Sequence, residues 1–262
     1  MQLGSSIVAV GVAGAIAGAI ALAPRAHGAA DAAPAAPVSA APAPSASPHA
    51  PASAPVKPAH VAKRVCTVAA VGDSITDTRS HGGKYLAYLQ KHCPQSHFDN
   101  YGVGGNMVNQ MRRRFARDVL GPSKPHYTHL IVFGGVNDLY SDLTAHRTNE
   151  RIERDLTKMY KAAHEHGMKV VAITVTPWGG FKRYFNIRRQ KHTLELNRWI
   201  KAEPDSGNVD FVVDAYPLLS CGDSEKLCPR YAKPFKDGIH FGAAGQKVLG
   251  KALYDAVFKS CL

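Results

Sequence analysis

Several features that mark other classes of protein are missing from this chain. It contains no internal repeat, so a repeat architecture is not expected. None of its five cysteines stands at CxxC spacing, which argues against a zinc site. His164 and His166 are too close together for the HExxH pattern of a zinc-binding helix. The sequence therefore predicts no metal site.

The first sixty residues have little charge and few bulky side chains. No Lys or Arg precedes the uncharged apolar run of residues 7–23, and small residues follow it. This pattern is typical of a signal peptide, although the run is close to the minimum that spans a bilayer. Residues 1–28 are expected to be a signal peptide or membrane anchor. Residues 29–62, rich in Ala, Pro and Ser, are expected to be a disordered linker, and residues 63–262 one folded domain.

Acidic residues are fewer than basic ones, and the chain carries a formal net charge of +12. Only Arg25, Asp31 and Lys57 are charged in the first sixty residues, so +11 remains for the rest of the chain. Such a balance favours contact with anionic surfaces. We expect an exported protein, periplasmic, secreted or anchored to the envelope, with peripheral envelope contact. Nucleic acid is not an expected partner, because an exported protein rarely meets it, and a monomer is expected.

The folded part alternates short apolar runs with amphipathic stretches. The runs predict strands at 67–71, 98–103, 130–133, 170–175 and 209–213. The amphipathic stretches predict helices around 85–92 and at 107–120, 149–166, 190–202 and 243–259. Strands that lack polar alternation and are separated by helices indicate a parallel sheet covered on both faces. The expected fold class is α/β, a three-layer sandwich with a mostly parallel five-stranded sheet of the flavodoxin-like kind.

Four polar or glycine-containing motifs follow predicted strands or open the last helix. They are Gly72-Asp73-Ser74-Ile75-Thr76, Asn100 to Asn106, Gly134-Gly135-Val136-Asn137-Asp138, and Asp237-Gly238-Ile239-His240. Each alone has a plain alternative, such as a helix cap or a tight turn. The glycines of residues 100–106 do not complete a dinucleotide-binding GxGxxG, because Met107 replaces the last Gly. Their joint placement predicts one crevice at the carboxyl ends of the strands.

The motifs resemble the four sequence blocks of the SGNH hydrolases, also called GDSL-type esterases and lipases. The resemblance places the nucleophile on Ser74, the acid on Asp237 and the base on His240. It also places oxyanion-hole donors on the Ser74 amide, Gly105 and Asn137. Ile75 departs from the Leu that many members have. The resemblance runs from about Thr67 to the end of the chain, and substrate cannot be inherited from it.

The resemblance implies a serine carboxylic ester hydrolase that needs no cofactor. His240 would deprotonate Ser74, which attacks an ester carbonyl, and water would then release the acyl group. Acylated glycans, lysophospholipids and small esters remain open as substrates. The alternative function is a catalytically silent envelope- or carbohydrate-binding domain on the same fold, which would have no need of all three triad residues.

An aromatic and basic segment, residues 178–192, follows the fourth predicted strand. It therefore starts on the predicted catalytic side. We expect Trp178, Phe181, Arg183 and Tyr184 to bind the substrate, and the basic residues favour an anionic one. The alternative is an ordinary exposed loop and helix start.

The cysteines suggest disulfides because an oxidising compartment is expected. Cys221 and Cys228 flank a short polar loop and are expected to pair. Cys66, Cys93 and Cys261 should all lie at the sheet edge opposite the crevice. We favour Cys66–Cys93, with Cys261 free.

Overall fold

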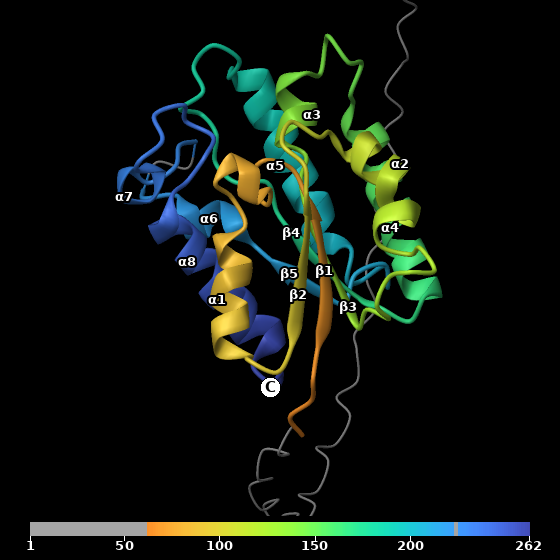
Figure 1. The fold of residues 1–262 in the computed structure, drawn as a ribbon. Coiled ribbons are helices and arrows are strands. Elements are labelled where there is room, and N and C mark those ends of the chain that lie inside the picture. The colour runs from red at the N-terminus through yellow and green to blue at the C-terminus, as the bar shows by residue number, and fades with distance from the viewer. Residues whose placement is uncertain (1–61, 223–224) are drawn as a thin grey trace, which may run out of the picture. The chain divides into compact units, whose positions relative to one another are not determined.

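The computed structural model describes residues 62–222 and 225–262, and they form a three-layer α/β sandwich (Figure 1). The predicted signal peptide or anchor and nearly all of the linker lie outside these residues. Among the described residues, no helix has the length and hydropathy needed to cross a bilayer.

The sheet has five parallel strands in the order β2-β1-β3-β4-β5, which is the flavodoxin-like order. The strands are β1 Thr67–Gly72, β2 His97–Gly102, β3 His129–Phe133, β4 Lys169–Ile173 and β5 Phe211–Val213. The predicted fold class is confirmed.

The longer helices are α1 Lys84–His92, α2 Val108–Asp118, α4 Asn149–Glu165, α5 Ile187–Ala202 and α8 Ala243–Leu253. Short ones are η1 Thr78–Ser80, α3 Val136–Tyr140, α6 Ala215–Leu219, α7 Pro229–Ala232 and the π-helical η2 Tyr254–Phe258. The short helices were not foreseen as separate elements. They are too brief for a helical hydrophobic period to be visible in the sequence.

Both faces of the sheet are apolar, as the continuous apolar runs predict. In β1, Ala69 and Val71 join a core with α2, α4 and α5, whereas Val68 and Ala70 join a second core with α1 and α8. The central strand β3 divides in the same way. Two buried faces explain why these strands lack polar alternation.

Both ends of α4 lie beside residues that favour the start or the end of a helix. Thr148 caps α4, because its side chain accepts a hydrogen bond from the Arg151 amide. Gly167, two residues beyond the end of α4, has a φ of +74°, a left-handed conformation that favours glycine and commonly ends helices. The glycine thus terminates the helix where the sequence predicted.

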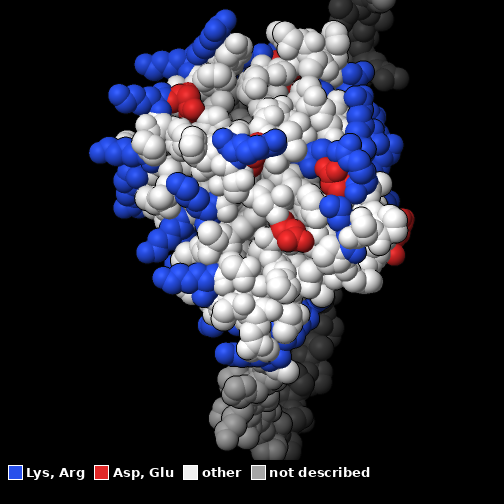
Figure 2. All heavy atoms as spheres, viewed as in Figure 1, with Lys and Arg blue, Asp and Glu red and all other residues white. Residues whose placement is uncertain are grey.

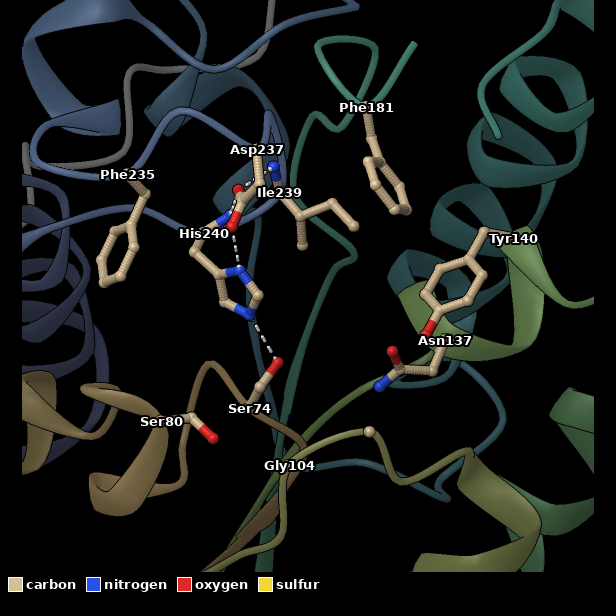
Figure 3. Close-up of a pocket in the computed structure, with 11 residues that line it drawn as sticks. Ser74, Ser80, Gly104, Asn137, Tyr140, Phe181, Phe235, Asp237, Ile239 and His240 are labelled. Carbon is tan, nitrogen blue, oxygen red and sulfur yellow. Dashed lines mark hydrogen bonds and ion pairs between the residues drawn. The ribbon is translucent and has the colours of Figure 1, made fainter. Parts of the chain in front are cut away.

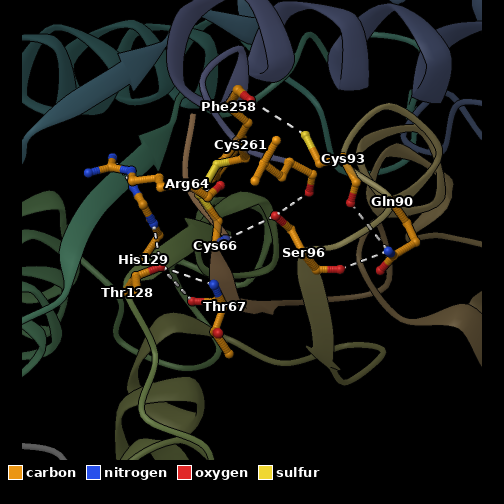
Figure 4. Close-up of a disulfide and its surroundings, with 11 residues drawn as sticks. Arg64, Cys66, Thr67, Gln90, Cys93, Ser96, Thr128, His129, Phe258 and Cys261 are labelled. Carbon is orange, nitrogen blue, oxygen red and sulfur yellow. Dashed lines mark hydrogen bonds between the residues drawn. A yellow bond between two sulfur atoms is a disulfide. The ribbon is translucent and has the colours of Figure 1, made fainter. Parts of the chain in front are cut away.

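Two disulfides are present, one of them not the pair that we favoured. Cys221–Cys228 forms as expected, but Cys66 pairs with Cys261, and Cys93 is the free, buried thiol (Figure 4). The preference for Cys66–Cys93 was wrong because the C-terminal segment runs beside the residues that precede β1. The Arg64 amide donates to the Ser260 oxygen at 2.9 Å, and the Leu262 amide to the Arg64 oxygen at 2.8 Å.

Candidate active site

The three predicted triad residues come together beyond the carboxyl ends of the strands (Figure 3). Ser74 is two residues beyond the end of β1, and His240 is three residues before the start of α8. Ser74 Oγ is 2.7 Å from His240 Nε2, and His240 Nδ1 is 2.7 Å from Asp237 Oδ2. This continuous chain lets His240 accept the hydroxyl proton of Ser74 while Asp237 stabilises the resulting imidazolium.

Asp237 is held as a charged acceptor. Its Oδ1 accepts the main-chain amides of Ile239 and His240, both at 2.9 Å. Partial burial opposes the charge, but these donors and the His240 ring outweigh it, so the pKa of Asp237 lies below its ordinary value. The carboxylate therefore remains ionised wherever a histidine can act as base.

Asp73, the neighbour of the nucleophile, has a different environment. Its Oδ1 accepts the Ile75 amide at 2.9 Å, but its buried Oδ2 has no protein partner. Burial raises the pKa of Asp73 to about 7, although the Ile75 amide and His240 oppose the shift. Asp73 thus supports the turn that carries Ser74 without joining the triad.

The second and third motifs line the opposite side of the same pocket. Gly105 has a φ of +76°, and a Cβ there would meet nothing within 4 Å, so open space surrounds this position. Asn137, in α3, is 5% exposed, and its Nδ2 donates to the Asn106 oxygen at 2.9 Å. The Gly104 amide donates to Asp77 Oδ2 at 2.9 Å, which fixes the start of this glycine loop.

The pocket is an open cleft of about 470 Å³. Phe235 lies on the His240 side, whereas Phe181 and Tyr140 lie on the Asn137 side (Figure 3). Tyr140, Phe235, Ser80 and Ile239 were not foreseen as lining residues. Tyr140 had a readable signal, because it is three residues after Asn137 on the same short helix and so shares its face.

The predicted substrate-binding residues divide into two groups. Phe181 lines the cleft, and Tyr184 packs beside it at a ring-centroid distance of 4.8 Å, with the Arg183 guanidinium over Tyr184. Trp178 does not line it. It is fully buried and donates from Nε1 to Thr193 Oγ1 at 2.9 Å, so its assignment to substrate binding was wrong.

Two glycines place Phe181 at the cleft. A Cβ on Gly238 would stand 2.0 Å from the Gly180 carbonyl carbon, so the loop of the triad and the start of the aromatic segment touch through their backbones. Gly238 also has a φ of +81°, which disfavours other residues. The contact brings the aromatic segment to the catalytic loop.

No group of three or more His, Cys, Asp or Glu side chains within residues 62–222 and 225–262 is arranged to hold a metal ion. The arrangement that these residues do form is a hydrogen-bonded chain of Ser74, His240 and Asp237 beyond the carboxyl edge of a parallel sheet. The fold and this geometry have the form of an α/β hydrolase site.

The chain belongs to the GDSL-like Lipase/Acylhydrolase family, whose model matches residues 70–248, more than half of the chain. The predicted resemblance is confirmed, and membership supports a hydrolase that acts on esters. No curated protein matches the sequence significantly.

Solved structures share the fold. A GDSL-like lipase from Bacteroides thetaiotaomicron is 21% identical with a TM-score of 0.60, and the match covers 74% of this chain and 88% of that one. A catalytic mutant of an acetylxylan esterase from Geobacillus stearothermophilus is 17% identical with a TM-score of 0.61, covering 78% of this chain and 99% of that one.

Proposed function

We propose that this chain is an exported serine esterase that removes an acyl group from an alcohol through an acyl-enzyme on Ser74. The observation that carries the proposal is the Ser74–His240–Asp237 hydrogen-bonded chain at the mouth of an open cleft. Two disulfides support export, because such bonds persist in oxidising compartments.

The proposed reaction uses only side chains and amides of this site. His240 Nε2 takes the Ser74 proton as Oγ attacks the ester carbonyl, and the oxyanion accepts hydrogen bonds from the Ser74 and Gly105 amides and from Asn137. The proton then passes to the leaving alcohol. A water molecule, deprotonated by His240, hydrolyses the acyl-enzyme and regenerates Ser74.

The shape of the site favours a short acyl group. Two further voids touch the nucleophile turn, one beside Phe241 and one beside Asp73, and neither has space for a water molecule. A long acyl chain therefore has no channel into the core among the described residues and would have to lie along the open cleft. The aromatic side chains of that cleft suit the C–H face of a sugar ring or an aromatic alcohol. The acetylxylan esterase among the structural neighbours acts on such a substrate, which supports an acetylated glycan as the first candidate.

The basic residues of segment 178–192 also support an anionic substrate, but fewer of these cations are available than the sequence predicts. Arg188 and Arg189 cannot steer it freely, since both form ion pairs with Asp142, at 2.5 and 2.7 Å. The Arg183 guanidinium lies over Tyr184, which packs against the cleft-lining Phe181, and no acidic partner of Arg183 is seen among the described residues. We expect Arg183→Gln to remove any fall in specificity constant with added salt on an anionic ester, without changing hydrolysis of a neutral one.

A fluorophosphonate probe and a set of p-nitrophenyl esters test the proposal. The protein should be labelled once, at Ser74, and should hydrolyse acetate faster than decanoate esters. Ser74→Ala should abolish both labelling and hydrolysis, whereas Ser80→Ala, a matched change in the same cleft, should retain labelling. Absence of labelling in the folded protein would favour the alternative, a catalytically silent envelope- or carbohydrate-binding domain.

A further inference from the structure

A second and larger cavity lies at the opposite edge of the sheet from Ser74. Its volume is about 790 Å³, within the usual range of small-molecule sites. Lys169 begins β4 and Phe211 begins β5, so the cavity is at the end where these strands start. Residues from the chain segment before β1 and from η2 complete its wall. Nothing in the catalytic arrangement uses this site.

Positive charge dominates the rim of this cavity. Four cations line it, namely Lys63, Arg64, Lys169 and Lys259, against a single acid, Asp255. Asp255 is already engaged in an ion pair with Lys251, one turn earlier on the same helical segment. None of the four cations forms an ion pair with an acid of the described residues. Figure 2 shows the wider pattern on one face, where Lys and Arg are frequent and Asp and Glu are few.

The interior of the cavity is apolar. Val257 is buried in its wall, Ala256 adjoins it, and the half-buried ring of Phe211 lies beneath the Lys169 ammonium at 5.7 Å. An apolar floor below a cationic rim is complementary to a molecule with one apolar tail and one anionic head.

The buried imidazole of His129 lies close to two of these cations, Arg64 and Lys169, which disfavour its protonation. His129 begins β3, in register with Lys169, and the Arg64 guanidinium is 3.4 Å from its Nε2. Burial, then Arg64 and Lys169, lower the pKa of His129 to about 4, with Asp210 opposing. His129 is therefore neutral at pH 7 and adds no charge of its own to the rim.

The acids near the cavity among the described residues are already engaged: Asp255 pairs with Lys251, and Asp210 pairs with His164 at 2.9 Å and accepts the Val170 amide at 2.7 Å. No Asp or Glu occurs between Asp31 and Arg64, and this whole stretch offers only the cations Lys57 and Lys63. Residues 32–63 of the sequence therefore contribute no acidic side chain, and an anionic ligand would complement the cationic rim.

We propose that this cavity binds a single-chain anionic amphiphile, of the fatty-acid type, with its head group among Lys63, Arg64, Lys169 and Lys259 and its alkyl chain against Phe211 and Val257. Because the site is at the far edge of the sheet, the ligand and an ester substrate occupy the protein together. The inference does not depend on the proposed esterase activity.

Isothermal titration calorimetry of the full chain tests this site. Ser74 is first blocked with a fluorophosphonate, and dodecanoate is added below its micelle concentration. We expect one saturable site, with no comparable binding of acetate, which lacks the tail, or of decyl maltoside, which lacks the charge. Lys63→Gln/Lys169→Gln/Lys259→Gln should weaken the dissociation constant at least tenfold. The matched control, Arg154→Gln/Lys158→Gln/Lys161→Gln, removes the same charge from the exposed face of α4 and should leave it within twofold.

A second variant and a second ligand source separate the remaining outcomes. Ala256→Trp should weaken dodecanoate binding by filling the cavity while all four cations remain. Far-ultraviolet circular dichroism and urea unfolding of each variant report that it is folded, whether or not the protein is an esterase. Equal weakening by both triple variants, or no saturable binding of dodecanoate, would overturn the proposal. Binding to phosphatidylglycerol vesicles without binding to monomeric dodecanoate would also overturn it, since the occupant would then be a lipid surface.

Discussion

The side chain of Asn137 is tied to the main chain of Asn106, with 2.9 Å between Nδ2 and the carbonyl oxygen. One amide hydrogen of Asn137 is thereby committed to the glycine loop. The other amide hydrogen of Asn137 can donate to a substrate in the cleft, which Asn137 lines together with Gly105. The bond thus ties Asn137 of α3 to the residue that follows Gly105 in the loop after β2, which holds the two proposed oxyanion donors together.

Replacing Asn137 should therefore slow the chemical step. Asn137→Ala removes one preorganised oxyanion donor, and we expect turnover of p-nitrophenyl acetate to fall by about 100-fold to 1,000-fold, with a much smaller change in KM. Asn208→Ala, which removes an amide bonded to Glu203 on the far side of the fold, serves as the control. A loss of turnover below about threefold for Asn137→Ala would remove Asn137 from the oxyanion hole.

The buried carboxyl of Asp73 should make stability depend on pH. Its pKa is about 7 in the folded protein against 3.8 as the ordinary value, so between these pH values the unfolded chain has lost the proton that the folded protein retains. The free energy of unfolding therefore falls as pH rises from about 4 to about 7, by up to about 4 kcal/mol from this group.

Asp73→Asn removes this titration while retaining an oxygen that can accept the Ile75 amide. We expect the variant to gain stability relative to the parent as pH rises through this window, measured by urea unfolding at successive pH values. Glu165→Gln, on an exposed residue at the end of α4, should show no such trend. A difference between Asp73→Asn and the parent that does not vary with pH would show that Asp73 is ionised in the folded protein.

A buried ion-pair network supports the Asn137 side of the cleft. Arg147 contacts Asp138 at 2.6 Å and Asp155 at 2.9 Å, and all three side chains are less than 9% exposed. Asp138 also accepts the Val108 amide at the start of α2. Removal of Arg147 would leave the buried Asp138 carboxylate without its ion-pair partner, whereas Asp155 would keep Arg112 at 2.7 Å.

Arg147→Met should therefore destabilise the protein by about 3–5 kcal/mol in chemical unfolding. The control is Lys191→Met, which breaks an exposed pair with Glu195 and should cost less than about 1 kcal/mol. Equal costs for the two variants would contradict the assignment of this network as a structural support.

Cys93 should be the single free thiol of the described cysteines. It is fully buried, its Sγ donates to the Phe258 oxygen at 3.4 Å, and burial raises its pKa, so it is protected from alkylation in the folded state. Iodoacetamide should leave the native protein unlabelled and should label one site, Cys93, after unfolding without reductant. Non-reducing peptide mapping should show Cys66 joined to Cys261. A Cys66–Cys93 peptide would refute this connectivity.

Much of the fold was predictable because the local sequence carries it. Apolar runs such as those of β1 and β3 have no polar alternation since both faces of the sheet are covered, and Gly167 ends α4 by its left-handed conformation. The positions of the catalytic candidates followed as well. Strand ends in a parallel sheet meet at one edge, so Ser74 and Asn137 had to share a crevice.

Other features were decided by contacts between distant segments. The sequence suggests that Arg188 and Arg189 are free cations, but both pair with Asp142, more than forty residues earlier, which offsets one of the two charges. The sequence predicted that Trp178 binds substrate, since it is an aromatic residue close to basic ones. In the structure its side chain is buried, and its indole nitrogen donates to Thr193 of α5.

The cysteine pairing and the second cavity belong to the same category. Local spacing places Cys66, Cys93 and Cys261 at one edge but cannot choose among them. The choice depends on the main-chain hydrogen bonds that align the last residues with Arg64. The sequence by itself determined the five strands, the longer helices and the candidate catalytic residues, because these depend on periodicity and on strand ends. Only the tertiary structure decided which cysteines pair and which cations remain unpaired, because these depend on distances between residues far apart in the chain.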